Sequence, residues 1–372
     1  MEHVIAAAIA FGAPFLLSLL LTIATRRAAL RLDFVDSPGG RKAHERPMPL
    51  GGGVAMFLAW AVPIAVLLLV AMGMGSSQPQ ASELRSHLAD LAERATPLAL
   101  LLGGSLILML LGLFDDLFGL SVRLRTVVMV AVATGLYLAS PEMRITLFSG
   151  VAGLSLLYTV GWVFGITNSF NFLDNTDGLS AGVAMVASVI LGVVGFQTDQ
   201  HVMAWLALAL AGATAGFLVF NFPPARIYMG DAGSLFLGFV LSVLTILFTF
   251  YRGDAAPSGQ LYSVLMPLFI LALPVFDTLT VIVIRLREGR PIWQGDRSHF
   301  SHRLLALGMS KREAVVFIYL VTFCLGIAST LLNSLRPMGA ITILVIGVTI
   351  FTLIALLERA GRRSNDPDAG GE

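Results

Sequence analysis

Long apolar stretches recur along the whole of this 372-residue chain and leave no polar interval long enough to fold as a separate domain. A helix needs about 20 predominantly apolar residues to cross the hydrocarbon core of a bilayer. Because lipid offers no hydrogen-bond partners to the backbone, segments of this kind are expected to be α-helical. Eleven such stretches cover residues 4–25, 50–73, 97–114, 126–140, 153–171, 179–197, 202–221, 234–251, 262–286, 313–333 and 338–357. The sequence therefore predicts an all-α polytopic membrane protein with about eleven transmembrane helices.

Composition supports this fold class and limits the partners. Apolar residues make up 56% of the chain and charged residues only 13%, which lies outside the range of soluble domains. A net charge of +1 argues against a nucleic-acid partner. We expect residues 1–358 to form a single integral-membrane domain and residues 359–372 a disordered cytoplasmic tail. The first stretch lacks a basic leading segment and is too long for a signal peptide, so it is read as a retained span.

Lys and Arg residues divide unequally between the two sides that these spans would create. If the N-terminus lies outside, only Arg85, Arg94, Arg144, Arg252 and Arg336 fall in outside segments, and the other 19 of the 24 basic residues fall inside. Because cytoplasmic connections carry an excess of Lys and Arg, the chain is predicted to place its N-terminus outside and its C-terminus in the cytoplasm. The outside segment "ASELRSHLADLAERA" is typical of an amphipathic surface helix.

The unusual acidic and histidine-containing segments fall on the same, cytoplasmic side. They are the "DD" pair after residue 114, "NSFNFLDNTDG", "PPARIYMGDAGS" and "WQGDRSHFSHRL". If the carboxylates of Asp115, Asp116, Asp174, Asp177 and Asp231 converged, each close pair would repel by up to ~4 kcal/mol at an effective dielectric constant near 20. A bound cation would offset this repulsion. Hard oxygen ligands favour Mg²⁺ or Mn²⁺, and Mg²⁺ is usually shared with substrate phosphates, which indicates a phosphate-bearing substrate.

Each of these acids also has a purely structural interpretation. Asp177 and Asp231 precede apolar helices and could be N-caps that accept hydrogen bonds from exposed backbone amides. Asp115 and Asp116 could be the solvated end of the third span. Asn168, Asn171, Asp174 and Asp177 are spaced by three, so neighbouring members share a helix face, and a polar coil that winds into a cavity is favoured over a lipid-facing one.

The remaining polar features are more ambiguous. His299 and His302, with Asp296, have a spacing that zinc sites use, but two histidines are few for such a site. Together with Arg290, Arg297 and Arg303 they suit an anion such as a diphosphate, or they form a loop that is basic only because it lies inside. The glycines of "HERPMPLGGG" could admit a ligand or allow close helix packing. Asp277 is an intramembrane acid without an evident partner, which is a functional hypothesis by default.

Taken in order, these motifs resemble the polyprenyl-phosphate N-acetylhexosamine-1-phosphate transferases (glycosyltransferase 4 type). The resemblance is carried by "RKAHERPMPLGGG", "GLFDDLFG", "NSFNFLDNTDGLSAG", "NFPPARIYMGDAGSLFLGF" and "DRSHFSHRLLALGMS" and covers almost the whole chain. It implies transfer of a sugar 1-phosphate from a UDP-N-acetylhexosamine to undecaprenyl phosphate with release of UMP, as the first membrane step of cell-envelope glycopolymer synthesis. It also implies Mg²⁺ and a site on the cytoplasmic face of the bacterial inner membrane, and it leaves open whether the chain forms a homodimer.

The resemblance also implies roles for individual residues. Asp115 would be the base that deprotonates the lipid phosphate, with Asp116 beside it, and Asp231 would be a metal ligand, shared with Asp115. Tyr228 would stack on uracil. Asn171, Asp174 and Asp177 match the polar run that lines the nucleotide site, and the last two are counted among the catalytic acids. The residues expected to contact phosphates or the acceptor are Lys42, Arg297, His299 and His302.

Two departures from the family pattern bear on the donor sugar. Asn175 stands where the family often has Gly, and Ser301 stands where many members carry a further His. The second departure makes the loop resemble the N-acetylglucosamine-1-phosphate branch more than the muramoyl-pentapeptide branch, which is the nearest alternative. A cation transporter with intramembrane acids is the remote alternative, and it predicts charges spread through the depth of the bilayer.

Overall fold

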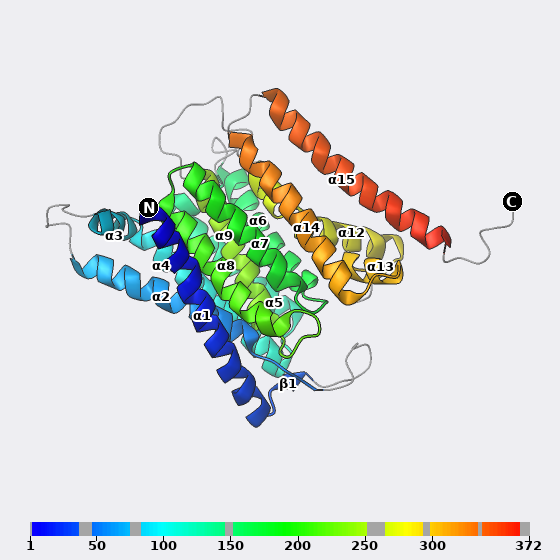
Figure 1. The fold of residues 1–372 in the computed structure, drawn as a ribbon, viewed down its shortest axis with the longest axis horizontal. Helices are drawn as coiled ribbons and strands as arrows, with labels where there is room; N and C mark the ends of the chain where they lie inside the picture. Colours follow the sequence, from blue (N-terminus) through cyan, green and yellow to red (C-terminus); the bar gives the residue numbers. More distant parts are fainter. Residues whose placement is uncertain are drawn as a thin grey trace. The chain divides into compact units, whose positions relative to one another are not determined.

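The computed structural model describes residues 2–36, 47–74, 83–145, 152–250, 265–292, 298–333 and 337–364. The chain forms two compact units, Met1–Gly253 and Asp254–Glu372, and each is considered by itself. Helices dominate both units (Figure 1). Within the described ranges, nine helices are long and apolar enough to cross a membrane. The expected all-α polytopic architecture is confirmed at this level.

The first unit contains nine α-helices among its described residues, a 3₁₀ turn and a small sheet. The helices are α1 Glu2–Arg31, α2 Gly52–Met74, α3 Glu83–Glu93, α4 Ala95–Phe118, α5 Val122–Ala139, α6 Ala152–Leu173, α7 Leu179–Gln197, α8 His201–Asn221 and α9 Gly230–Phe250, with η1 at Pro141–Met143. Strands β1 (Val35–Asp36) and β2 (Met48–Pro49) pair antiparallel, with Val35 opposite Pro49. Helix α3 lies where the amphipathic surface helix was predicted.

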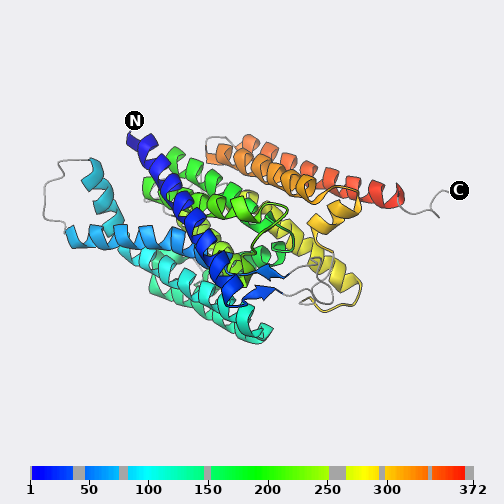
Figure 2. The same cartoon turned by 60° about the horizontal axis from the view of Figure 1, so that its bottom comes forward.

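Helix α9 is the centre of this unit, because α2, α4, α6 and α7 all pack against it and 94% of the residues in its apolar stretch are buried. Helix α1 lies along α8, and α7 lies on the other side of α8 (Figures 1 and 2). Small residues allow these close approaches, as is usual between membrane helices. A Cβ on Gly212 of α8, for example, would overlap the carbonyl of Phe11 in α1.

Glycines also bring α2, α4 and α9 together at one end of the unit. A Cβ on Gly53 would overlap the backbone of Gly233, and a Cβ on Gly112 would overlap the carbonyl of Asp231. The amides of Gly52 and Gly53 donate to the carbonyls of Tyr228 and Met229, at 3.1 and 3.0 Å. Of the two interpretations of the "GGG" motif, the structure therefore supports close packing of helix ends.

The second unit contains α11 Leu265–Ile270, α12 Ala272–Arg287, α13 Phe300–Ala306, α14 Lys311–Thr330, η2 Leu331–Asn333 and α15 Pro337–Ser364. Helix α14 starts with a capping box, in which Ser310 and Glu313 exchange side-chain and backbone hydrogen bonds. Helix α15 continues past the boundary expected at residue 358 and ends at Ser364.

The expected spans and the observed helices differ in two places. The stretch 262–286 is divided between α11 and α12, because Pro274 has no N–H to donate to the carbonyl of Ile270 and the helix is interrupted between them. Helix α6 is 22 residues long but has Asn168, Ser169 and Asn171 near its end, and it is not among the nine apolar helices. The other nine predicted stretches each coincide with one of those helices.

Candidate active site

Three of the predicted acids meet where α4 ends and α9 begins. Asp115 and Asp116 lie in the last turn of α4, and Gly119, with a φ of 66°, ends that helix. Asp116 reaches across to α9, where its carboxylate accepts hydrogen bonds from the amides of Asp231 (2.8 Å) and Ala232 (3.1 Å). These are amides of the first turn of α9, which have no partner within their own helix. Asp116 therefore caps α9 from a neighbouring helix and fixes the position of Asp231.

Arg125, in the first turns of α5, links the other two acids. Its Nη1 atom donates to the Oδ2 atom of Asp115 and also to the Oδ2 atom of Asp231, the latter at 3.0 Å. The second oxygen of Asp115 accepts a hydrogen bond from the amide of Leu120 at 2.6 Å. Two carboxylates from different helices thus share one guanidinium nitrogen.

Asn171 completes this group from the end of α6. Its Nδ2 atom donates to the Oδ1 atom of Asp231 at 2.7 Å and to the Oγ atom of Ser234 at 3.0 Å. The Asp231 carboxylate is therefore held on one oxygen by an amide and on the other by a guanidinium. Asn168, one turn earlier, donates instead to the carbonyl of Phe164 at 2.8 Å.

A second polar group lies beside the first one, in the turn after α6 and the segment before α9. Burial, and then the carboxylates of Asp116 and Asp177, raise the pKa of Asp174 to about 8. Burial, and then the carboxylates of Asp177, Asp36 and Asp174, raise the pKa of Tyr228 to about 12. Asp174 thus lies close enough to Tyr228 to act on its hydroxyl group electrostatically. The backbone of Tyr228 bridges Pro49 of β2 and Gly52 of α2.

The structure answers the question of helix capping for two acids. Asp177 does not cap α7, because the N-cap residue is Gly178 and makes no side-chain cap, while Asp177 accepts a hydrogen bond from the amide of Ala225 at 3.2 Å. Asp231 lies within the first turn of α9 and its side chain points to Arg125 and Asn171. Among the acids of this site, Asp116 is the one that caps a helix.

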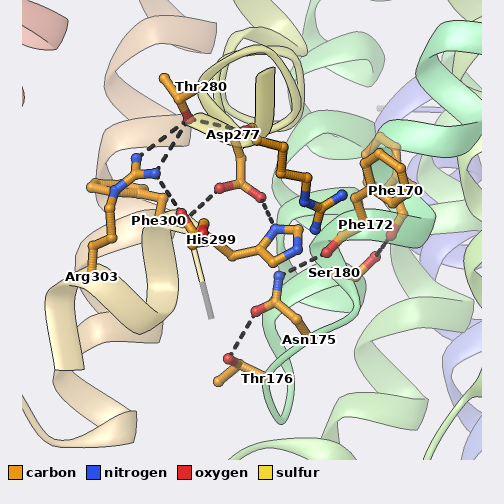
Figure 3. A network of polar contacts seen from close by, with 12 residues as sticks. Phe170, Phe172, Asn175, Thr176, Ser180, Asp277, Thr280, His299, Phe300 and Arg303 are labelled. Carbon is orange, nitrogen blue, oxygen red and sulfur yellow. Dashed lines mark hydrogen bonds and ion pairs between the residues drawn. The ribbon is translucent and has the colours of Figure 1, made fainter. Parts of the chain in front are cut away.

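The second unit contains a buried polar network around Asp277, which Figure 3 shows with Thr280, His299, Phe300 and Arg303. Asp277 of α12 is 1% exposed, and its carboxylate contacts the Nδ1 atom of His299 at 2.8 Å and accepts from the amide of Phe300 at 2.6 Å. Arg303 donates to Glu358 of α15 at 2.9 Å and to the carbonyl of Ser298 at 2.6 Å. The partner that Asp277 lacked in the sequence is thus the histidine loop, 22 residues later.

The remaining predicted residues lie in the second unit or outside the described residues. His302 lies on α13, three residues after His299. Lys42 and Arg297 lie outside the described residues, as does Asp296. Sequence reasoning missed Arg125, which counted only as one more inside charge. Its signal was its place at the start of the helix that follows the "DD" pair.

Two carboxylates of this group are suited to hold the expected magnesium ion. In the described part of the chain, no three or more His, Cys, Asp or Glu side chains are arranged to hold a metal by themselves. Mg²⁺ commonly takes only one or two carboxylates and completes its shell with water and substrate phosphates. Asp115 and Asp231, two carboxylates already gathered around one cationic group, fit that requirement.

The chain is also similar to known proteins along most of its length. The profile of glycosyl transferase family 4 matches residues 98–249. The chain is 31% identical to the "Probable undecaprenyl-phosphate N-acetylglucosaminyl 1-phosphate transferase" of Bacillus subtilis, over 95% of this chain and 92% of that protein. It is 32% identical to the "Decaprenyl-phosphate N-acetylglucosaminephosphotransferase" of Mycobacterium tuberculosis, over 92% and 87%. It is 29% identical to the "Undecaprenyl-phosphate alpha-N-acetylglucosaminyl 1-phosphate transferase" of Yersinia pestis, over 84% and 80%.

The profile match spans α4 to α9 and so includes the four helices that supply Asp115, Arg125, Asn171 and Asp231. The relatives extend the similarity to almost the full length of the chain. The resemblance of the motifs, the convergence of the acids and the relatives therefore agree: this chain belongs to glycosyl transferase family 4, the polyprenyl-phosphate N-acetylhexosamine-1-phosphate transferases.

Proposed function

We propose that this protein transfers N-acetylglucosamine 1-phosphate from UDP-N-acetylglucosamine to undecaprenyl phosphate and releases UMP. The observation that carries the proposal is the convergence of Asp115, Asp116, Asn171 and Asp231 at one end of the first unit, joined by direct contacts. The similarity to named N-acetylglucosamine-1-phosphate transferases supports the choice of donor and acceptor.

The reaction needs a charged, water-restricted site more than it needs a covalent intermediate. An oxygen of the lipid phosphate attacks the phosphorus that carries the sugar, and the bond from that phosphorus to the bridging oxygen breaks as UMP leaves. Phosphoryl transfers of this kind depend mainly on positioning and on electrostatic stabilisation. Asp115 would take the proton of the acceptor phosphate where one is present. Asp116 acts through α9, which it holds in place.

We further propose that Asp231, with Asp115, would hold a Mg²⁺ ion, or Mn²⁺ in its place. When bound, the ion would neutralise the donor diphosphate and the charge that develops on the leaving UMP. Asn171 would keep the Asp231 carboxylate oriented, because it already bonds one of its oxygens. Asp174, Asp177 and Tyr228 would line the nucleotide side, with the Tyr228 ring against the uracil.

The histidines of the second unit are further candidates for contact with phosphate groups or the acceptor. Asp277 fixes the ring of His299 through its Nδ1 atom, which leaves the orientation of the imidazole determined by a buried carboxylate. We propose that His299 and His302 contact phosphate groups, with Lys42 and Arg297 as further cationic residues.

The unequal distribution of Lys and Arg supports a defined orientation in the bacterial inner membrane. With the N-terminus outside, the ends of α4 and α6 and the starts of α5 and α9 face the cytoplasm, where the soluble donor is made. The hydrophobic acceptor would reach the same site from the bilayer. This arrangement explains why the acids gather at one face, which a transporter would not require.

The test is a reconstituted transfer assay. The full chain in nanodiscs is incubated with UDP-N-acetylglucosamine, undecaprenyl phosphate and Mg²⁺, and UMP is measured. Release that requires both the lipid and the metal is expected, and Asp115→Asn or Asp231→Asn should lower it at least about 100-fold. If well-folded protein released no UMP from any UDP-N-acetylhexosamine, the proposal would be wrong.

The donor separates this function from its nearest rival. A muramoyl-pentapeptide transferase would use UDP-N-acetylmuramoyl-pentapeptide as its donor and would turn over UDP-N-acetylglucosamine poorly. In a competition assay, added UDP-N-acetylmuramoyl-pentapeptide should therefore leave the rate of UMP release from UDP-N-acetylglucosamine unchanged. Inhibition by the pentapeptide donor, together with its turnover, would favour the rival.

A further inference from the structure

We propose that Arg125 is an exchangeable internal counter-ion, which occupies the place of the divalent cation between Asp115 and Asp231 and leaves it when the cation binds. The inference rests on the proposed function, because it assumes that Asp231 and Asp115 receive a divalent ion. It goes beyond that function because it gives Arg125, on α5, control over the affinity of the site for the divalent cation.

The contacts around Arg125 support this role. A single nitrogen, Nη1, contacts Asp115 and Asp231, which belong to different helices, so one positive charge is shared by two carboxylates. The side chain of Arg125 is 23% exposed and that of Asp231 is 31% exposed, whereas that of Asp115 is 8% exposed. Both Arg125 and Asp231 are thus partly open to solvent, so the contact between them is not sealed in the core as Asp115 is.

The oxygens of the two acids leave little room for both cations. One oxygen of Asp115 is bonded by the amide of Leu120, and one oxygen of Asp231 is bonded by Asn171. The other oxygen of each acid is the one that Arg125 contacts. A divalent ion that bound both carboxylates through those oxygens would therefore meet the guanidinium, and two cations in one place repel each other.

This competition has a measurable consequence. If the binding-competent state is only a fraction of the population, the apparent dissociation constant exceeds the intrinsic one by the inverse of that fraction. Arg125 thus weakens binding of the free ion while keeping the two acids together before it arrives.

The experiment measures binding of Mn²⁺ to the purified full chain without substrate, by electron paramagnetic resonance. Arg125→Gln should bind Mn²⁺ at least about tenfold more tightly than the wild type, because the competing charge is gone. Arg125→Lys keeps the charge and should stay within about threefold of the wild type. The matched control is Arg123→Gln, which removes an exposed positive charge two residues earlier in α5 and should leave the affinity unchanged.

A second measurement follows thermal unfolding of the same proteins in EDTA and in Mn²⁺. Arg125→Gln should unfold at a lower temperature than Arg123→Gln in EDTA, since its two acids are uncompensated, and Mn²⁺ should raise its Tm more than that of the wild type.

The outcomes separate this inference from the proposed function. Saturable Mn²⁺ binding that is equal or weaker in Arg125→Gln, in protein that is still folded, would overturn the counter-ion exchange and leave the transferase intact. It would show that Arg125 organises the ligands instead. Absence of Mn²⁺ binding in every variant, including the wild type, would overturn both the exchange and the proposed metal site.

Discussion

Adjacent aspartates at the end of α4 have different partners because successive helical residues point about 100° apart. Asp115 turns toward Arg125 and the amide of Leu120, whereas Asp116 turns toward the first turn of α9. One side chain therefore faces a guanidinium and the other a pair of backbone amides. At the scale of the residue, the "DD" pair combines the proposed base, Asp115, with a positioning group, Asp116.

The positioning role of Asp116 can be tested through stability. Asp116→Ala removes the acceptor for the amides of Asp231 and Ala232 and should lower the free energy of unfolding by about 1–2 kcal/mol, as loss of an N-cap does. Asp116→Asn keeps one acceptor oxygen and should recover part of that loss. The measurement is thermal unfolding in detergent without divalent ions. Equal stability of the wild type and both variants would show that the cap contributes nothing.

Asp174 makes a prediction about pH. Its folded-state pKa of about 8 lies above the usual value of 3.8, so the folded protein binds more protons than the unfolded chain between these values. The stability that it contributes is therefore complete below about pH 4 and is lost as pH rises through about 8. Asp174→Asn should flatten the decline of Tm between pH 5 and pH 9 in EDTA. Parallel profiles for the variant and the wild type would contradict the raised pKa.

At the scale of the elements, a glycine allows the end of α4 to touch the start of α9. Gly112→Ala would push a Cβ into the carbonyl of Asp231 and should destabilise the protein by about 1–3 kcal/mol, with a loss of transfer activity. Gly103→Ala in the same helix is the matched control, because no atom lies within 4 Å of its added Cβ. It should be neutral or stabilising by up to about 1 kcal/mol. Equal effects of the two changes on unfolding and on UMP release would rule out the close contact.

The elements show what a sequence can predict here and what it cannot. Of the eleven spans expected from hydropathy, nine coincide with a long apolar helix, because the composition of a segment determines whether it can lie in lipid. Hydropathy placed the end of α4 before Asp115 and the start of α9 after Asp231. It detects apolar residues, whereas the backbone hydrogen bonds of both helices continue into polar sequence. The link from Asp277 to His299 was not predictable either, because it joins residues 22 positions apart through tertiary folding.

At the scale of the whole molecule, the alternation of helix direction in the first unit gathers chemistry from segments far apart in the chain. The ends of α4 and α6 and the starts of α5 and α9 supply Asp115, Asn171, Arg125 and Asp231 to one group. The opposite ends carry none of the predicted catalytic acids. An enzyme that joins a soluble donor to a lipid acceptor needs this asymmetry, since only one membrane face meets the donor.

The orientation of the molecule can be tested with its own cysteine content. Cys324 is the single cysteine, so Cys324→Ala gives a background without thiols. On it, Glu93→Cys at the end of α3 and Arg123→Cys at the start of α5 replace exposed residues at the two ends of the first unit. Because basic residues predict α3 outside and the start of α5 inside, an impermeant maleimide should label only Glu93→Cys in intact cells, and both variants after lysis. Labelling of Arg123→Cys alone in intact cells would invert the topology and place the acids of the site on the wrong face for a cytoplasmic donor.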